Sequence, residues 1–437
     1  MSSRVFVAMV AGVVALATAA VAPAKQPAPS AGQVPVPTAR VTFKDAVDQA
    51  IRRNPTVQQA SAEIMRAEGL LQQARSSILP GVTGSVVTVT QSQGTAVING
   101  EAVTPRNQLT GSLGVSAPIL APVLWAQRVQ ALDEVHVAQA GLADVRRQIA
   151  VATAQAYLAI VARRRAFEAN VRARDTARAH FDLAHTQRAA GSGSLLNELR
   201  AEQSASADET LVEQAALDVY RAQEALGVLT GADSPVDTID DPVLQVPATL
   251  ASLQASMPEV RSDVRLAAAR EAAAARVWKD SWKDWLPFAS GLVQPQYLQP
   301  ATIFQPSASW RAQIAVTVPL FDAGLRSAVR AERRALFSQS QLQHEAVLRQ
   351  ANSDVRTADE SVKSADRGLV SATAAAAQAR QVLDIVNVSF RAGAATEIEV
   401  IDAQRALLDA ETSVAVGEDL LRQARLALLV ALGQFPS

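Results

Sequence analysis

The chain contains no cysteine and only four histidines among its 437 residues. The absence of cysteine excludes disulfide bonds, thiolate metal sites, cysteine nucleophiles and a lipid-modified N-terminal cysteine. The formal net charge is only -1, so no overall electrostatic field attracts nucleic acid or anionic lipid. Hydrophobic residues nevertheless make up 49% of the chain and charged residues 19%, which is a composition typical of folded proteins. We therefore expect a folded protein with no nucleic-acid partner.

The sequence also lacks an arrangement of residues that could carry catalysis. The histidines are scattered, and His180 and His185 are five residues apart, so they do not share a helical face as an i, i+4 metal-binding pair would. No nucleophile elbow and no phosphate-binding loop occurs. We expect no catalytic residue, no enzymatic activity, no cofactor and no bound metal.

The N-terminus has the pattern of a secretory signal. Arg4 precedes an almost unbroken apolar run at residues 5–20, and small residues follow it. The run is short for a membrane-spanning helix, so we expect residues 1–24 to be a signal peptide that is removed. A retained N-terminal anchor is the alternative. Residues 25–40 are rich in proline and alanine and are expected to be a flexible leader.

Long hydrophobic runs are missing from the rest of the chain. No later segment offers about 18 consecutive apolar residues, so no further transmembrane helix is expected. An exported protein of this kind is either soluble in the periplasm or enters the outer membrane as a β-barrel, whose signal in each strand is much weaker.

The two halves of the chain carry the same landmarks in the same order, at a nearly constant offset. Such agreement indicates an ancient duplication, with residues 41–231 as the first repeat, 256–437 as the second and 232–255 as the linker. The matched landmarks are Asn54-Pro55 with Met257-Pro258, Leu79-Pro80 with Leu286-Pro287, Ala117-Pro118 with Val318-Pro319, Arg188-Ala189-Ala190-Gly191 with Arg391-Ala392-Gly393, and Leu229-Thr230-Gly231 with Leu432-Gly433.

Each repeat is predicted to begin with a helix, at residues 42–78 and 258–285. The Leu-Pro pairs end these helices, because proline disfavours helix in the residue before it. Two strands are expected next in each repeat, within residues 82–117 and 288–319. Their second strands alternate between apolar and polar residues, a pattern typical of a strand and required of a barrel wall between lipid and water.

Two long helices close each repeat. In the second repeat, large apolar residues recur every seven positions with small residues between them, which indicates supercoiled helix packing. A helix over residues 322–392 would be about 105 Å long at 1.5 Å per residue, far longer than a globular core can cover. Residues 191–194 and 393–396 leave room only for sharp reversals, so each repeat is expected to end in an antiparallel helical hairpin.

A single chain with these elements is incomplete in a membrane. Four strands make no closed barrel and two hairpins make no tube, and open strand edges are not viable in lipid. The chain must therefore assemble with copies of itself, and a cyclic ring is the natural solution.

These landmarks resemble the TolC family of outer membrane efflux proteins across nearly the whole mature chain. The most specific stretch, Phe390 to Ala403, is similar to the helix-turn-helix tip of that family, with an aromatic residue, a glycine and two acidic residues three apart. The resemblance implies a mainly α fold with a small β part. It also implies a homotrimer with a transmembrane β-barrel of twelve strands, four from each subunit, continued by an α-helical coiled-coil tunnel across the periplasm.

The function implied by the resemblance is an exit duct in the cell outer membrane that extends into the periplasm. It would serve a tripartite efflux or type I secretion system as a passive conduit, gated at its periplasmic end. Its implied partners are outer-membrane lipid, a periplasmic adaptor (membrane fusion) protein and an inner-membrane transporter.

Two acidic residues are the candidate gate. Glu399 and Asp402 share a helix face, and by resemblance they match the acidic pair that narrows the periplasmic mouth. Three copies would form carboxylate rings that favour cations. An alternative explains each acid locally: Thr396 and Glu399 form a capping-box pattern at a helix start, and Asp402 can pair with Arg405.

The hairpin tips are the candidate contacts for the adaptor, although helix reversals require such turns in any case. The sequence departs from the family pattern here, since Ala395 stands where a basic residue is common, and Phe390 lacks the hydroxyl of a tyrosine. In the first hairpin, Asn197 stands where the family has an acid. The tip residues are Gly191, Ser192, Gly193, Ser194, Gly393, Ala394, Ala395 and Thr396.

The competing hypothesis is a soluble periplasmic coiled-coil adaptor or scaffold, which would have no barrel strands. One feature stays open: Trp278, Trp282 and Trp285 form either an interfacial aromatic belt or ordinary core packing. The arginine runs at 163–165 and 333–334 are expected on solvated helix faces.

Overall fold

The structure, a computed structural model, describes residues 39–92, 97–98, 101–103, 105–246 and 257–435. The predicted signal peptide at 1–24 and nearly all of the predicted leader lie outside the described residues. Two leader residues, Ala39 and Arg40, are described, and they belong to a strand rather than to a flexible segment.

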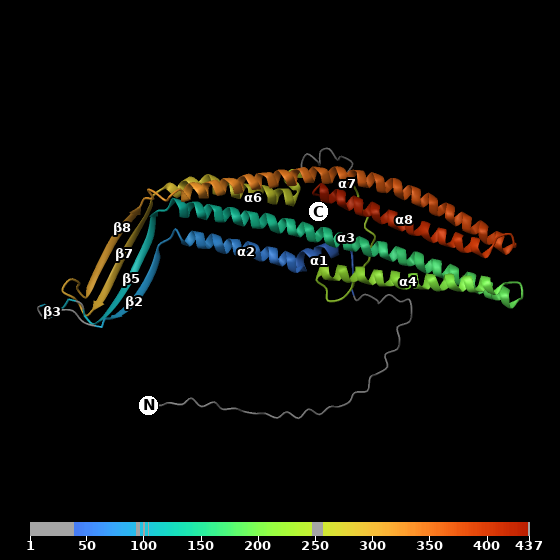
Figure 1. Cartoon of the computed structure of the whole chain (residues 1–437), viewed down its shortest axis with the longest axis horizontal. Coiled ribbons are helices and arrows are strands. Elements are labelled where there is room, and N and C mark those ends of the chain that lie inside the picture. The colour runs from blue at the N-terminus through green and yellow to red at the C-terminus, as the bar shows by residue number, and fades with distance from the viewer. Residues whose placement is uncertain (1–38, 93–96, 99–100, 104, 247–256, 436–437) are drawn as a thin grey trace, which may run out of the picture.

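The chain forms an elongated body with a β-sheet at one end and two helical hairpin tips at the other (Figure 1). Its first half contains β1 (Ala39–Val41), α1 (Phe43–Arg53), α2 (Pro55–Ser76), β2 (Gly81–Thr90), the short strands β3 (Val97–Ile98) and β4 (Glu101–Ala102), β5 (Asn107–Leu120), α3 (Pro122–Ala189), α4 (Leu195–Thr230) and β6 (Val236–Thr238). Its second half contains α6 (Ser262–Asp280), the 3-10 helix η1 (Ser281–Trp285), β7 (Phe288–Gln299), β8 (Ala308–Thr317), α7 (Leu325–Arg391) and α8 (Glu397–Ala431).

The first predicted helix, residues 42–78, is in fact two helices that meet at Asn54. Asn54 has an extended backbone (φ -62°, ψ 128°), as expected before Pro55. Its side chain accepts a hydrogen bond from the Thr56 amide at 2.9 Å and so caps α2. Pro55 and its capping residue thus divide the segment that was predicted as one helix.

The starts of two later helices also differ from the prediction. The chain expected to be helical from residue 258 is helical at residues 257–260, is interrupted at Arg261, which is extended (φ -66°, ψ 125°), and continues as α6 from Ser262. The helix expected from residue 322 begins as α7 at Leu325, because Ala323 (φ 51°) and Gly324 (φ 91°) are left-handed. The carboxylate of Asp322 accepts hydrogen bonds from the amides of Gly324 and Arg326 and stabilises this turn.

The duplication is visible in matched contacts between helix ends. In the first repeat, the Asn54 side-chain amide donates to the carbonyl of Leu229 at the end of α4, at 3.1 Å. In the second, Arg261 donates to the carbonyl of Ala431 at the end of α8, at 3.4 Å. Gly231 (φ 68°) and Gly433 (φ 74°) follow these two helices in the left-handed conformation that glycine favours. Each repeat therefore folds its last helix back on the start of its own first helices.

The predicted linker is partly ordered against the first repeat. Its strand β6 pairs in parallel with β1, with Val41 opposite Thr238. Tyr157 of α3 is fully buried beside this pair, and its hydroxyl donates to the carbonyl of Asp240 at 3.1 Å. Arg164 pairs with the buried Asp237 of β6. The prediction that this arginine run is solvated was therefore wrong for Arg164 and for Arg165, which binds the linker residue Asp241 at 2.5 Å, whereas Arg163 is exposed as expected.

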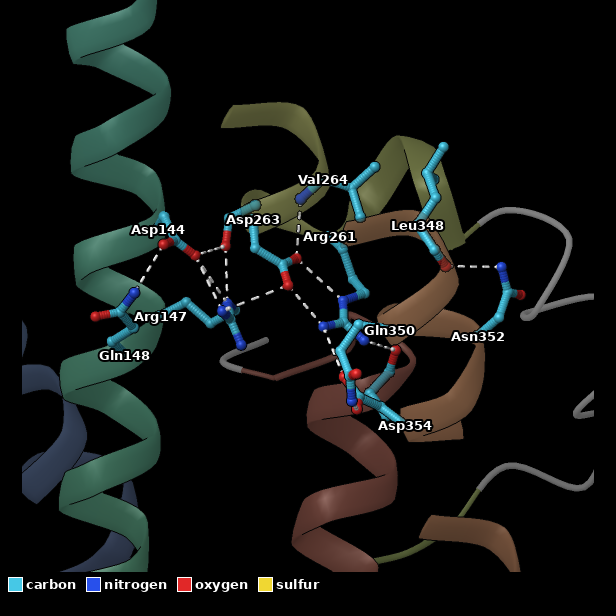
Figure 2. A network of polar contacts seen from close by, with 12 residues as sticks. Asp144, Arg147, Gln148, Arg261, Asp263, Val264, Leu348, Gln350, Asn352 and Asp354 are labelled. Atoms are coloured by element: carbon cyan, nitrogen blue, oxygen red, sulfur yellow. Dashed lines mark hydrogen bonds and ion pairs between the residues drawn. The ribbon is translucent and has the colours of Figure 1, made fainter. Parts of the chain in front are cut away.

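A polar network joins the two repeats near the middle of the molecule (Figure 2). Arg261, only 5% exposed, binds Asp263 at 2.6 Å and Asp354 of α7 at 3.1 Å. On the other side, Asp144 of α3 accepts a hydrogen bond from Ser262 at 3.0 Å. Burial by itself raises the pKa of Asp263, but hydrogen bonds from Arg261 and its positive charge outweigh burial and lower that pKa.

The predicted seam between α7 and α8 is packed as the heptad pattern requires. Val355 and Ala358 of α7 pack against Leu428 and Ala431 of α8 in one buried cluster. Further along, a Cβ on Gly417 would lie 3.4 Å from the side chain of Leu369, so a small residue lets the two helices approach closely.

Candidate functional site

Four strands form one antiparallel sheet in the order β2-β5-β7-β8, so both repeats contribute to it. The pairing of β5 with β7 keeps one register from Leu109 to Pro118, and a bulge or irregularity shifts it between Pro118 and Leu120. The outer edges of β2 and β8 have no partner strand within the described chain.

One face of this sheet is apolar across all four strands. Residues directly opposite each other share a face, and Val86 of β2, Leu113 of β5, Val293 of β7 and Ile314 of β8 all lie on this one. Val86 is 76% exposed and Ile314 71% exposed. An apolar surface of this extent, left uncovered by the described chain, indicates contact with lipid or with another protein. The large side chains on this face are Val82, Val86, Leu109, Leu113, Val115, Val293, Tyr297, Trp310, Ile314 and Val316.

The other face is lined by hydrogen-bonded polar side chains. The hydroxyls of Ser85 and Ser112 lie 2.7 Å apart, and Gln294 donates to the Ser112 hydroxyl at 3.2 Å. Arg311 donates to the side-chain oxygen of Gln294 at 2.7 Å. A ten-residue strand such as β8 extends about 33 Å at 3.3 Å per residue, comparable to the roughly 30 Å hydrocarbon core of a bilayer. The sheet thus has the dimensions and the two-faced chemistry of a membrane-spanning wall.

The three tryptophans of α6 and η1, which the sequence assigned either to core packing or to an interfacial belt, differ in their surroundings. Trp278 is stacked on Phe337 of α7, with ring centroids 5.3 Å apart, so it packs one helix on the other. Trp282 is half exposed, and the guanidinium of Arg330 lies 5.9 Å from the ring centroid of Trp285. Arg333 binds Asp284 at 2.7 Å, so this arginine is ion-paired rather than merely solvated.

The tip of the first hairpin is closed by backbone geometry that needs glycine. Gly191 is left-handed (φ 77°), and the Ser192 amide donates to the carbonyl of Gln187 at 2.9 Å. A Cβ on Gly193 would come within 2.8 Å of the Arg188 amide, so no larger residue fits without movement. Ser194 then caps α4 by accepting from the amide three residues on.

The tip of the second hairpin has the same construction. Gly393 is left-handed (φ 75°), and the Ala394 amide donates to the carbonyl of Ser389 at 2.8 Å. Ala395 precedes Thr396, whose hydroxyl accepts from the amide of Glu399. The two tips form corresponding turns, as the duplication predicts, and all eight predicted tip residues lie in them or cap the next helix.

The two candidate gate acids are exposed on the first turns of α8. The carboxylate of Glu399 completes a capping box by accepting from the Thr396 amide at 2.6 Å. This backbone hydrogen bond, with that of the Thr396 hydroxyl, lowers the pKa of Glu399. Asp402 is exposed and forms no ion pair with Arg405 within the part of the chain that the structure describes. The local alternative is therefore realised for Glu399 and not for Asp402.

A buried pair near the tips links the two hairpins and escaped the sequence analysis. Nε2 of His180 in α3 lies 2.6 Å from Oε1 of Glu397 at the start of α8. These residues are only 7% and 3% exposed, and the Phe390 ring packs on the edge of the imidazole at 5.5 Å. They are 217 positions apart, so no local spacing could pair them. The remaining carboxylate oxygen of Glu397 is buried without a partner among the described residues.

Further charged contacts strengthen both hairpins. In the first, Glu198 of α4 binds Arg188 and His185 of α3, and these partners lower the pKa of Glu198. Within the second hairpin, Glu411 of α8 binds Arg380 of α7 at 2.5 Å, and the same carboxylate reaches across to Arg172 of α3 in the first hairpin at 3.4 Å. The two hairpins are thus joined near their tips by a buried pair and farther along by an exposed bridge.

The described residues contain neither a metal-binding cluster nor a membrane-spanning helix. Within the described ranges, no group of three or more histidine, cysteine or acidic residues could hold a metal ion. None of the described helices combines the length and the apolar character that crossing a membrane requires.

The family model of the outer membrane efflux protein matches residues 46–232 and 256–434. The chain belongs to the outer membrane efflux protein family. The two matched segments follow the two halves of the chain, and the mainly α, duplicated fold and the family predicted from the sequence are confirmed. This membership also establishes the class of function: the protein is an efflux channel of the outer membrane and not an enzyme.

Solved structures share the fold of this efflux protein at low sequence identity. A membrane protein from Pseudomonas aeruginosa is 19% identical, with a TM-score of 0.79, and the match covers 89% of this chain and 93% of that one. The outer membrane protein VceC from Vibrio cholerae is 19% identical, with a TM-score of 0.76 and coverage of 90% and 96%. The open state of the MtrE outer membrane channel from Neisseria gonorrhoeae is 18% identical, with a TM-score of 0.75 and coverage of 92% and 94%. No curated protein sequence matches this chain significantly.

Proposed function

We propose that three copies of this chain close a twelve-stranded barrel in the outer membrane and act together as an exit duct. The observation that carries the proposal is the four-stranded sheet with two open edges and one apolar face. Unpaired edges cannot face lipid, so β2 of one copy must pair with β8 of the next. Such closure directs the apolar face to lipid and the hydrogen-bonded polar face to the lumen.

The helices continue this duct into the periplasm. The last residues of β5 and β8 lead into α3 and α7, each more than sixty residues long and directed away from the sheet (Figure 1). A helix of 67 residues extends about 100 Å at 1.5 Å per residue. Ring assembly places the hairpins side by side as a tunnel, with the tips at its periplasmic mouth. At that mouth the tips at 191–194 and 393–396 contact a periplasmic adaptor, which connects the duct to an inner-membrane transporter.

Glu399 and Asp402 form the gate of this mouth. Both are exposed and lie about one turn apart on α8, so a threefold ring brings six carboxylates to one constriction. Such rings favour cations and hinder anions. The hydrogen bonds that lower the pKa of Glu399 keep its carboxylate charged into mildly acidic conditions.

The experiment has two levels. Membrane fractionation of the full-length protein, with heat-modifiable mobility on gels, tests for an assembled outer-membrane trimer. Single-channel recording then compares the wild type with the double variant Glu399→Gln, Asp402→Asn. We expect a cation-selective conductance whose selectivity falls in the variant.

The possible outcomes separate the parts of the proposal. Unchanged selectivity in the double variant keeps the duct and discards the gate. A soluble protein without channel activity overturns the duct. The alternative of a soluble adaptor is not favoured, because it leaves the four long strands and their uncovered apolar face without a role.

A further inference from the structure

The four long strands of the sheet contain a single charged residue, Arg311. No aspartate, glutamate, lysine or histidine occurs in β2, β5, β7 or β8, all of whose residues are described. A charged side chain in a membrane-spanning sheet is costly unless it faces water, so the face of the sheet on which it lies decides its role. Arg311 is paired in register with Gln294 and therefore lies on the polar face.

The side chain of Arg311 is held in place by neutral groups. Its Nη2 donates to Oε1 of Gln294 at 2.7 Å, and Gln294 in turn donates to Ser112 at 3.2 Å. Ser112 lies 2.7 Å from Ser85, so one hydrogen-bonded row crosses the sheet from β8 to β2. The row fixes the position of the guanidinium along the strands without neutralising its charge.

The charge of Arg311 also has no acidic partner within the described residues. Two other arginines near this end of the molecule do have one: Arg326 binds Asp322 at 3.3 Å, and Arg333 binds Asp284 at 2.7 Å. Arg311 is exposed, and its only side-chain hydrogen bond among the described residues is to a neutral amide. Its full positive charge therefore acts on the space in front of the polar face.

We propose that Arg311 sets the ion preference of the barrel part of the duct and favours anions there. This inference rests on the proposed function, because closure of the barrel turns the polar face into the lumen. In the trimer, the three guanidinium groups form a positive ring at one level of the wall, with only neutral side chains from the strands around it. Rings of arginine attract anions for the reason that rings of acids attract cations.

The consequence is a duct whose two ends carry fixed charge of opposite sign. The ring of Arg311 lies in the barrel, and the carboxylates of Glu399 and Asp402 lie at the far mouth. Under one polarity of applied voltage, cations and anions both accumulate between two rings of opposite charge. Under the other polarity, both kinds of ion are depleted there. The conductance is then rectified. The effect grows as salt is diluted, because the Debye length rises from about 10 Å at 0.1 M to about 30 Å at 0.01 M.

The test is single-channel recording of the full-length trimer in a salt gradient, with Arg311→Gln, Arg311→Ser and the charge-retaining Arg311→Lys. We expect both neutral variants to form trimers and to shift the anion-to-cation permeability ratio towards cations by about twofold or more at low salt. The shift should shrink near 1 M salt, where the Debye length is about 3 Å. Arg311→Lys should keep the wild-type ratio, and both neutral variants should rectify less.

The outcomes separate this inference from the duct itself. A channel whose permeability ratio and rectification are the same in wild type and in both neutral variants overturns the role of Arg311 and leaves the duct intact. An equal change in Arg311→Lys also overturns it, because loss of the hydrogen bond rather than of charge would then be the cause. A protein that forms no channel in any variant, wild type included, instead refutes the proposed function.

Discussion

The buried contact between His180 and Glu397 should determine how firmly the two hairpin tips hold together. We consider the substitution Glu397→Ala. It removes the carboxylate that lies 2.6 Å from Nε2 of the histidine and leaves that nitrogen without a partner at a position only 7% exposed. A buried polar group that loses its partner costs about 1–3 kcal/mol, and breaking a buried ion pair costs about 3–5 kcal/mol.

The expected magnitude lies at the lower end of these values. The pair is close to the tips, where local opening can bring water to the histidine. We therefore expect about 2 kcal/mol, which corresponds to a roughly thirtyfold increase in local opening of the tips. Amide hydrogen exchange of the purified full-length protein measures this directly, as loss of protection around residues 177–184 and 397–403.

A control variant and a compensating double variant test the cause of this effect. Glu345→Ala removes an exposed carboxylate that binds Arg349 one turn away, and it should change protection by less than threefold. Replacing the buried pair by His180→Phe with Glu397→Leu should restore much of the protection, because well-packed apolar residues substitute for buried ion pairs at little cost. The reasoning is refuted if Glu397→Ala leaves the tips as protected as in wild type, or if the double variant opens as readily as the single one.

Three further predictions follow from the same structure. Ile314→Arg on the apolar face of β8 should cost about 2–4 kcal/mol of stability and reduce trimer assembly, whereas Gln313→Arg on the opposite face should be tolerated. Heat-modifiable mobility on gels compares the two variants. Equal effects would contradict the assignment of faces. Arg261→Ala removes the ion-pair partner of Asp354 and the nearer of two arginines at Asp263, and should destabilise the central network by about 1–3 kcal/mol, seen as faster hydrogen exchange there but not at the tips. The stabilisation that the Glu399 cap gives should be fully present above the ordinary pKa of a glutamate and be lost as pH falls through the lowered pKa of Glu399. Thr396→Ala should move that loss to higher pH. A pH series of hydrogen exchange at the start of α8 can detect or disprove this shift.

The sequence specified the elements of this fold well, because the signals for them are local. Alternation with a period of two marked the second strand of each repeat, and heptads with interleaved small residues marked the long helices of the second repeat. Gly191 and Gly393 marked the hairpin tips, because their left-handed backbone is favourable only for glycine. The capping box of Thr396 and Glu399 was also readable, since its two members are three residues apart.

Errors arose where a contact distant in sequence or a local break changed the outcome. Residues 42–78 were predicted as one helix, yet the capping side chain of Asn54 divides that segment. Ala39 and Arg40 were assigned to a flexible leader, but they form β1 with a strand of the linker. Arg164 looked like part of a solvated run because its partner, Asp237, lies 73 residues away.

The sequence by itself determined the period of each element, the places where the chain must turn and the duplication, because each depends on the intrinsic geometry of neighbouring residues. Only the tertiary structure decided which side chains meet. It paired His180 with Glu397 across the hairpins and aligned Arg311 with a neutral row through the register of four strands. Such contacts join positions that the chain brings together only after helices and strands have packed, so their energies are set by burial and distance rather than by sequence spacing.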